Sequence, residues 1–104
     1  MKKIRIVKYG KKIFPFFCDL INENKRQHVD ILRGRCQRLA IDAEKQAGQI
    51  VPTDPPVYQL KVLAHELENV EYPEGYGIYF VCRDNAVLIL KIEHVTNAFE
   101  NGGF

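Results

Sequence analysis

The chain has 104 residues and a mass of 12.0 kDa, which is enough for one hydrophobic core and too little for two. Hydrophobic residues make up 46% and charged residues 27% of the sequence, which excludes a disordered or fibrous chain. The net charge of +2 conceals an asymmetry, because residues 1–38 carry a net charge of +8 and residues 39–104 carry −6. Such a split favours either an anionic partner for the N-terminal half or salt bridges across a compact fold.

No uninterrupted apolar run exceeds five residues, far short of the ~20 that a membrane span needs. The basic N-terminus is not followed by the apolar stretch of a signal peptide, so secretion is not predicted. The cysteines Cys18, Cys36 and Cys82 are widely spaced and contain no Cys-x-x-Cys pair, so we expect reduced thiols rather than disulfides or a zinc knuckle. Together these features predict a cytoplasmic protein.

Residues 3–9 begin by alternating basic and apolar side chains and include β-branched residues. This pattern predicts a strand at a sheet edge or with one buried face, ended by Gly10. Apolar residues between positions 13 and 21 recur at helical spacing. Because proline fits only the first turn of a helix, Pro15 predicts a helix that begins near Phe14.

The longest predicted element is a helix with Asn24 as its N-cap and Gly48 just beyond its last turn. A single apolar stripe of about six turns supports this prediction, and its members are Val29, Leu32, Cys36, Leu39, Ala43 and Ala47. Gly34 lies inside this helix at a cost of about 1 kcal/mol relative to alanine. Prolines at positions 52, 55 and 56 predict that residues 49–56 form a loop.

Residues 57–62 predict a strand, whereas residues 65–72 fit either a strand or a helical turn. The clearest signal is a β-hairpin, in which apolar runs at 76–82 and 86–92 flank an Asp84-Asn85 turn. Because both runs are almost continuously apolar, we expect central strands. Residues 95–104 are expected to be a turn or a frayed tail. The order predicts one two-layer α+β domain, residues 1–104, with two N-terminal helices packed on three or four mainly antiparallel strands.

Several familiar catalytic patterns are absent from the sequence. It has no glycine-rich phosphate loop, no Gly-x-Ser-x-Gly and no His-Glu-x-x-His. The spacing of His28, His65 and His94 does not favour a metal, so we expect neither a metal nor another cofactor. Cys36 and Cys82 fall on expected buried faces, which favours packing over a nucleophilic role.

The sequence of residues 57–94 resembles that of a known protein family. The segments concerned are Leu60-Lys61-Val62-Leu63, Glu66-Leu67, Glu74-Gly75-Tyr76-Gly77-Ile78-Tyr79-Phe80-Val81, Asp84-Asn85 and Val87-Leu88-Ile89-Leu90. In these segments, and in the order of its elements, the chain resembles the RelE/ParE superfamily of small bacterial toxins, within it the HigB-like branch. The resemblance implies the toxin of a type II toxin–antitoxin system: a metal-independent endoribonuclease that cleaves mRNA, inhibits translation on the ribosome and is held by a cognate antitoxin.

Two departures from the family pattern leave other functions open. Family members usually carry an arginine just before the Ile-Tyr of the motif, where this chain has Gly77. The segment after Glu66-Leu67 is usually basic, whereas residues 68–71 here are acidic. A non-enzymatic member of the same fold is therefore an alternative, either a ParE-like inhibitor of another protein or a catalytically degenerate member. A third alternative is an accessory protein with an unrelated α+β fold.

Metal-independent RNA cleavage uses the 2′-OH of the substrate as nucleophile. The protein must take up its proton, stabilise charge on the phosphate and protonate the leaving oxygen. The candidates for these roles are Lys61, His65, Glu66, Arg83, Lys91 and His94. His94 is favoured because it follows an apolar strand, because histidine as a residue type has an ordinary pKa near neutrality, and because the resemblance implies a functional His or Tyr near this point. Lys91 would stabilise charge. The alternative is that these are ordinary solvent-facing strand and turn residues.

The basic N-terminal half provides a second argument for RNA. Six bases without an acid are expected to contact phosphates: Lys2, Lys3, Arg5, Lys8, Lys11 and Lys12. The basic face of the long helix is expected to meet an acidic antitoxin through Arg26, Arg33, Arg35 and Arg38. The alternative is a solvated face that keeps the protein soluble.

Overall fold

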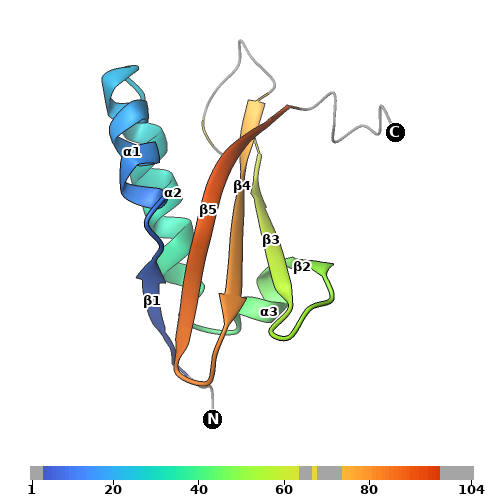
Figure 1. The fold of residues 1–104 in the computed structure, drawn as a ribbon. Coiled ribbons are helices and arrows are strands. Elements are labelled where there is room, and N and C mark those ends of the chain that lie inside the picture. The colour runs from blue at the N-terminus through green and yellow to red at the C-terminus, as the bar shows by residue number, and fades with distance from the viewer. Residues whose placement is uncertain (1–3, 64–66, 68–73, 97–104) are drawn as a thin grey trace.

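The computed structural model describes residues 4–63, 67 and 74–96, in which helices precede most of the strands (Figure 1). The elements in chain order are β1 (Ile6–Tyr9), α1 (Ile13–Asn22), α2 (Arg26–Arg38), α3 (Ala43–Gln46), β2 (Gly48–Val51), β3 (Val57–Val62), β4 (Glu74–Cys82) and β5 (Ala86–Thr96). The predicted α+β class is confirmed. Within the described residues, the N-terminal helices pack with an open sheet of five strands rather than three or four.

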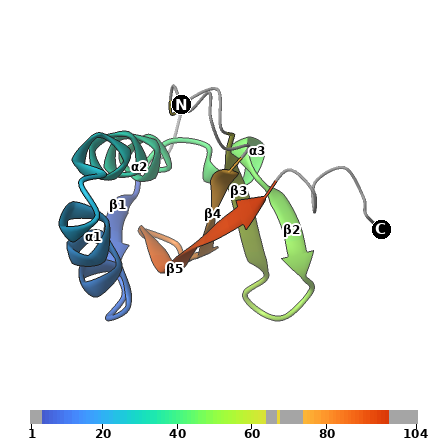
Figure 2. The same cartoon turned by 90° about the horizontal axis from the view of Figure 1, so that it is seen from above.

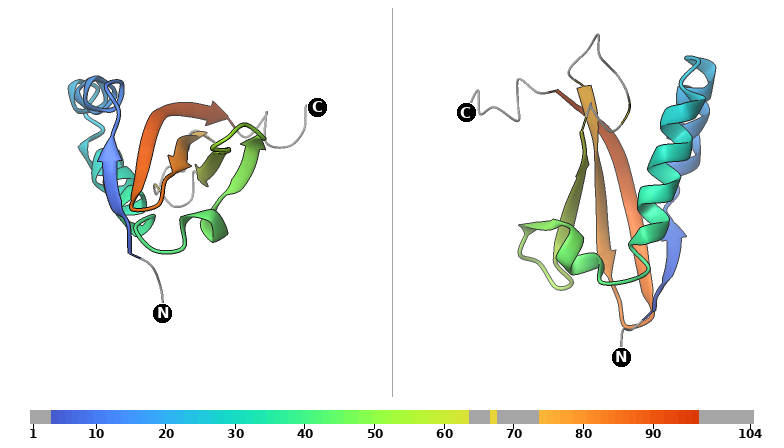
Figure 3. Two further views of the ribbon diagram at one scale, coloured as in Figure 1. Left: turned by 60° about the horizontal axis from the view of Figure 1, so that its bottom comes forward. Right: turned by 180° about the vertical axis from the view of Figure 1, so that it is seen from behind.

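The strand order in this sheet is β1-β5-β4-β3-β2. β1 pairs with β5 in parallel, and every other neighbouring pair is antiparallel. The sheet curves so that β1 and β2 stand at opposite ends of an arc (Figure 3). The hairpin around Asp84-Asn85 is confirmed, as are the edge position of the first strand and the interior position of β4 and β5.

The chain leaves β1 through a close approach to β5. The Gly10 N–H donates to the carbonyl oxygen of Ile89 at 2.8 Å. A Cβ atom at Gly10 would lie 2.8 Å from that same oxygen, so only glycine fits without a shift of the backbone. α1 then begins at Ile13, one residue before the predicted start, with Pro15 in its first turn.

The core lies between α1, α2 and one face of the sheet. Ile13, Phe17 and Leu20 of α1 are buried, and so are Val29, Leu32 and Cys36 of α2. They form one cluster with buried strand residues, among them Val62, Tyr76, Ile78, Phe80, Val87 and Ile89. α1 and α2 lie side by side next to β1 and β5 (Figure 2). Helical spacing of apolar residues therefore predicted the buried side chains of α2 correctly. On α1 it was only partly right, because Phe14 and Ile21 are exposed.

The single long helix predicted from Asn24 to Gly48 is wrong. α2 ends at Arg38, and Asp42 adopts a left-handed conformation with φ 53° before the short α3. The interruption is held by the segment before β1, because Ile4 and Ile41 form a β-bridge and the Arg5 N–H donates to the Ala40 carbonyl at 2.8 Å. These contacts override the local helical preference of residues 39–42.

Two boundaries also differ from the prediction. Asn24 does not cap α2: it has φ 62° in the α1–α2 connection, a region that Asn tolerates better than most residues, and Lys25 is the flanking residue. Residues 48–51 form β2 on the edge of the sheet, where a loop was predicted from position 49. The prolines restrict the loop to residues 52–56.

The C-terminal strand is longer than predicted. β5 continues through Val95 and Thr96, which were expected in the frayed tail, whereas residues 97–104 lie outside the described residues. In the described part of the chain, no helix has the length and apolar character needed to cross a membrane.

Candidate functional site

The two faces of the sheet differ in chemistry. Side chains alternate between faces along a strand, and paired residues share a face. Tyr76, Ile78 and Phe80 of β4 belong to the core and mark the face packed against the helices. The register then places a second set on the opposite side, which we call the open face: Val57, Gln59, Lys61, Gly77, Tyr79, Val81, Leu88, Lys91 and Glu93.

A polar network crosses three strands on the open face. The Gln59 Nε2 donates to the Tyr79 hydroxyl at 2.9 Å, and this hydroxyl donates to Oε1 of Glu93 at 2.6 Å. The Lys91 Nζ lies 3.3 Å from Oε2 of Glu93 and 4.9 Å from the centre of the Tyr79 ring. The carboxylate of Glu93 is thus held between a phenol and an ammonium group, and the ammonium also makes a cation–π contact.

The network shifts the pKa values of Glu93 and Tyr79 in opposite directions. The hydrogen bond from Tyr79, assisted by Lys91, lowers the pKa of Glu93 against the opposing effect of burial. Burial, followed by the hydrogen bond to Glu93 and then by its charge, raises the pKa of Tyr79. At neutral pH, Glu93 is therefore an ionised proton acceptor and Tyr79 a protonated donor.

Gly77 gives the network its space. A Cβ at this position would lie 3.1 Å from the Gln59 Nε2 and 3.4 Å from the Tyr79 hydroxyl oxygen. Gln59 and Tyr79 therefore occupy the space above the residue where the family resemblance leads one to expect an arginine. In register, Gly77 also lies directly between Lys61 on β3 and Glu93 on β5.

His94 lies on the other face of the sheet. It pairs with Tyr76, with the two ring centres 4.8 Å apart, and it lies 5.7 Å from the ring of Phe16. The Nδ1 of His28 is 2.8 Å from the Tyr76 hydroxyl, and burial, followed by Lys25 and His94, lowers the pKa of His28. The structure therefore brings Lys61 and Lys91 to one face but does not bring His94 to join them.

The other predicted catalytic residues are dispersed. Arg83 is exposed at the start of the hairpin turn, away from the Tyr79–Glu93 pair along β4. His65 and Glu66 lie outside the described residues. Burial raises the pKa of Cys36 to about 12 and that of Cys82 to about 11, so neither thiol supplies a thiolate nucleophile at neutral pH.

The predicted phosphate-binding residues at the N-terminus do not form one surface. Arg5 is engaged by Glu44, with its two terminal nitrogens 2.6 and 3.0 Å from the carboxylate oxygens. Lys8 is exposed on β1, Lys11 and Lys12 are exposed before α1, and Lys2 and Lys3 lie outside the described residues. On α2, Arg35 is half-buried, whereas three of the predicted partner-binding residues are exposed: Arg26, Arg33 and Arg38.

Sequence reasoning missed Gln59, Tyr79 and Glu93 as site residues. The signal was present for Tyr79, which alternates with the core residues Ile78 and Phe80. It was absent for Glu93, because strict alternation would put Glu93 on the face of Val87 and Ile89, and only the register shift opposite Tyr79 and Phe80 moves it to the open face. Among the residues that the structure describes, no group of three or more His, Cys, Asp or Glu is placed to hold a metal ion. The arrangement instead offers one carboxylate, one phenol, one amide and two ammonium groups on the open face.

Comparison of the chain with protein-family models, curated proteins and solved structures found no match.

Proposed function

We propose that the chain binds single-stranded RNA on the open face and cleaves it without a metal, acting as the mRNA endoribonuclease toxin of a type II toxin–antitoxin system in the cytoplasm. The observation that carries this proposal is the Tyr79–Glu93 hydrogen bond of 2.6 Å, with Lys91 beside it and Lys61 across Gly77. It supplies a carboxylate base and two cations around one position, which is what this chemistry requires.

The register suggests a role for each group. Lys61, Gly77 and Glu93 form one row across three strands, so the backbones of Lys61 and Glu93 are two strand spacings, or about 9.6 Å, apart. A phosphodiester lying over the Gln59 amide and the Tyr79 hydroxyl, which cover Gly77, would meet Glu93 on one side and Lys61 on the other. Glu93 takes the proton of the 2′-OH as its oxygen bonds to phosphorus. Lys61 gives a proton to the 5′ oxygen as its bond to phosphorus breaks, leaving a 2′,3′-cyclic phosphate and a 5′-OH.

The remaining groups stabilise charge. Lys91, already close to Glu93, is placed to offset the negative charge that builds on the phosphoryl oxygens. The Gln59 amide and Tyr79 hydroxyl lie between the acid and the base and can donate to the same oxygens. His94 lies on the other face and takes no part in this scheme.

The test is cleavage of a defined mRNA in the presence of EDTA, with and without ribosomes. The native protein should give 2′,3′-cyclic phosphate and 5′-OH ends, and Glu93→Gln should slow cleavage by about 10²- to 10⁴-fold. Glu23→Gln, at an exposed carboxylate just after α1, is the matched control and should cleave normally. His94→Gln should also retain activity. Equal rates for Glu93→Gln and the native protein would refute the proposal.

A non-enzymatic binding protein of the same fold is the second candidate. The observation in its favour is that Gly77 brings no cation and that both oxygens of Glu93 are already engaged, by Tyr79 and Lys91. Such a protein would bind RNA or another protein and leave it intact. Purification from cells followed by identification of what co-purifies separates the two candidates, since an acidic antitoxin would accompany either form, whereas intact RNA would accompany only the second.

A further inference from the structure

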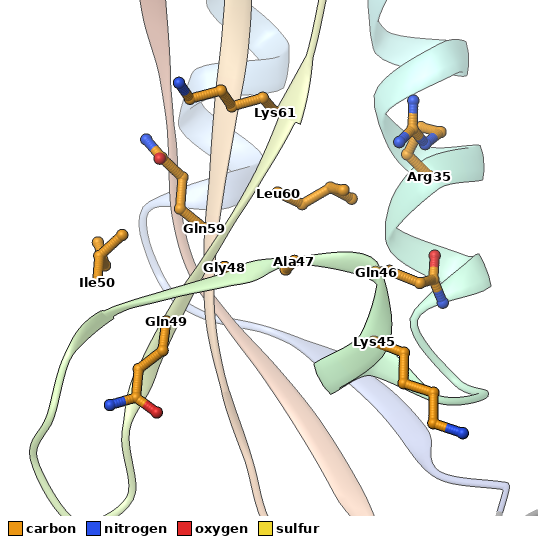
Figure 4. Close-up of a pocket in the computed structure, with 10 residues that line it drawn as sticks. All are labelled: Arg35, Lys45, Gln46, Ala47, Gly48, Gln49, Ile50, Gln59, Leu60 and Lys61. Carbon is orange, nitrogen blue, oxygen red and sulfur yellow. The ribbon is translucent and has the colours of Figure 1, made fainter.

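A groove of about 500 Å³ lies where the edge strand β2 leaves the sheet (Figure 4). β2 pairs with β3 only as far as Gly48 opposite Gln59, while β3 continues to Val62. One wall of the groove is the end of α3 with the start of β2, and Arg35 of α2 stands across from β3. The groove has the size of an ordinary small-ligand site.

The lining of the groove is cationic and rich in amides. The polar side chains that line it are Arg35, Lys45, Lys61, Gln46, Gln49 and Gln59. No carboxylate is found among the described residues that line it. Three cations around one depression attract an anion, and the Gln49 amide can donate to phosphate oxygens and to the edges of bases. The Gln46 Nε2 already donates to the carbonyls of Arg38 and Ile41, and the Gln59 Nε2 donates to Tyr79.

The groove is continuous with the open face. Gln59 and Lys61 line the groove and also belong to the open face. In Figure 4, Lys61 and Gln59 project from one side of β3, while Leu60 projects from the other, toward Arg35. An extended polyanion leaving the open face over the edge of β3 would therefore pass Lys61 and then meet Arg35 and Lys45.

We infer that this groove binds backbone phosphates of single-stranded RNA, a few nucleotides away from the phosphodiester that lies between Lys61 and Glu93 in the proposed function. The inference rests on the proposed function for the identity of the polyanion. A nucleic acid strand suits the groove better than an acidic protein segment does, because protein interfaces are usually anchored by large apolar or aromatic side chains, and the larger apolar residues that line this groove are Ile50 and Leu60.

The experiment measures binding separately from cleavage. The probes are fluorescent 2′-O-methyl oligoribonucleotides, which lack the nucleophilic hydroxyl. One has three nucleotides, and the other has about ten, a length within the usual range of single-strand sites. Arg35→Gln and Lys45→Gln should each weaken binding of the longer probe by about 3- to 10-fold and reduce its salt dependence by about 0.7 in log–log slope, the value for one phosphate contact with a single strand. Binding of the trimer should not change.

Arg26→Gln is the matched control. It lies nine residues before Arg35 on α2, which is half a turn away around the helix axis and about 13.5 Å along it. It should bind both probes like the native protein. Circular dichroism establishes that each variant is folded, and Lys45, which is exposed, gives the decisive variant if the substitution of half-buried Arg35 disturbs the fold.

The possible results separate this inference from the proposed function. Weaker binding of the longer probe by Lys45→Gln supports the groove as a phosphate site, even if the native protein cleaves no RNA. If Lys45→Gln binds the longer probe as tightly as Arg26→Gln does, the inference is overturned, even if the native protein cleaves RNA. If Lys45→Gln loses binding to poly-glutamate but still binds the longer oligonucleotide like the native protein, the inference is also overturned, and the groove is then a site for an acidic protein.

Discussion

Tyr79→Phe removes one hydroxyl group and leaves the rest of the open face in place. That hydroxyl accepts a hydrogen bond from Gln59 at 2.9 Å and donates one to Glu93 at 2.6 Å. The ring itself, with Lys91 above it, is retained in phenylalanine. The substitution therefore tests the hydrogen bonds alone, independently of any function of the protein.

The expected loss of stability follows from the two bonds. A neutral hydrogen bond contributes roughly 0.5–1.5 kcal/mol and one to a charged group roughly 1.5–3 kcal/mol. The side chain of Glu93 is 45% exposed, so water replaces part of what the hydroxyl supplied. We therefore expect the free energy of unfolding at pH 7 to fall by about 1–2 kcal/mol, which is at or below the lower end of the combined range of roughly 2–4.5 kcal/mol.

The loss should depend on pH in one direction. The hydrogen bond from Tyr79 holds the pKa of Glu93 below its ordinary value in the folded protein. A group whose pKa is depressed on folding stabilises the protein above its unfolded pKa, about 4.3 for Glu, and this contribution disappears as the pH falls through the folded pKa. The difference between native protein and Tyr79→Phe should thus be largest at pH 7 and shrink below pH ~4.

Urea unfolding of both proteins from neutral pH downward measures this difference. Tyr58→Phe is the control, since Tyr58 stacks on Phe80 at 5.5 Å and its hydroxyl makes no hydrogen bond within the described residues. It should cost less than about 0.5 kcal/mol at every pH. An equal loss for Tyr79→Phe at pH 7 and in acid, or no loss at all, would refute the argument that the bond to ionised Glu93 is what stabilises the network.

Three further predictions concern stability elsewhere in the fold. Glu44→Gln breaks the paired contacts with Arg5 at 2.6 and 3.0 Å and should lower the free energy of unfolding by about 1 kcal/mol at low salt, with a smaller effect in about 1 M salt. Burial lowers the pKa of His28, so the native protein should lose stability as the pH falls below about 6.5, and His28→Gln should flatten that part of the pH profile. Leu32→Ala, at a side chain with 0% exposure, should cost about 2–5 kcal/mol by urea unfolding, whereas Ile6→Ala, at 63% exposure, should change stability by no more than about 0.5 kcal/mol. A similar cost for these last two substitutions would contradict the assigned core.

The apolar stripe of residues 29–43 shows what helical spacing does and does not predict. Ala47, the last residue of the predicted stripe, is only partly buried, whereas Val29, Leu32, Cys36, Leu39 and Ala43 are all buried, as the spacing indicated. The helix nevertheless ends at residue 38, and the last two of them reach the core from a turn and from α3. Periodicity therefore predicted burial correctly and continuity wrongly, because the interrupting contacts come from residues 4 and 5, which no local window contains.

β2 was missed for a different reason. All four of its residues are exposed, so the alternation that identifies a half-buried strand is absent. Its pairing comes from β3, and the register shift between Gln49 and Val51 weakens the pattern further. The nearby prolines made a loop the better local prediction, and only the partner strand distinguishes the two. The groove beside Gly48 could not be predicted from the sequence because it exists only where this pairing stops.

Which residues share the open face depends on the alternation of side chains along a strand. Lys91 and His94 are three residues apart, a separation that brings two side chains together on a helix and sends them to opposite faces of a strand. Because the predicted second strand of the hairpin ends at residue 92, the alternation assigns no face to His94, and the sequence alone leaves it able to join Lys91. β5 continues to Thr96, so alternation extends through both positions and pairs Lys91 with Glu93 instead. Chemically suitable residues near one another in a sequence thus identify a site only once the length of the element that carries them is known.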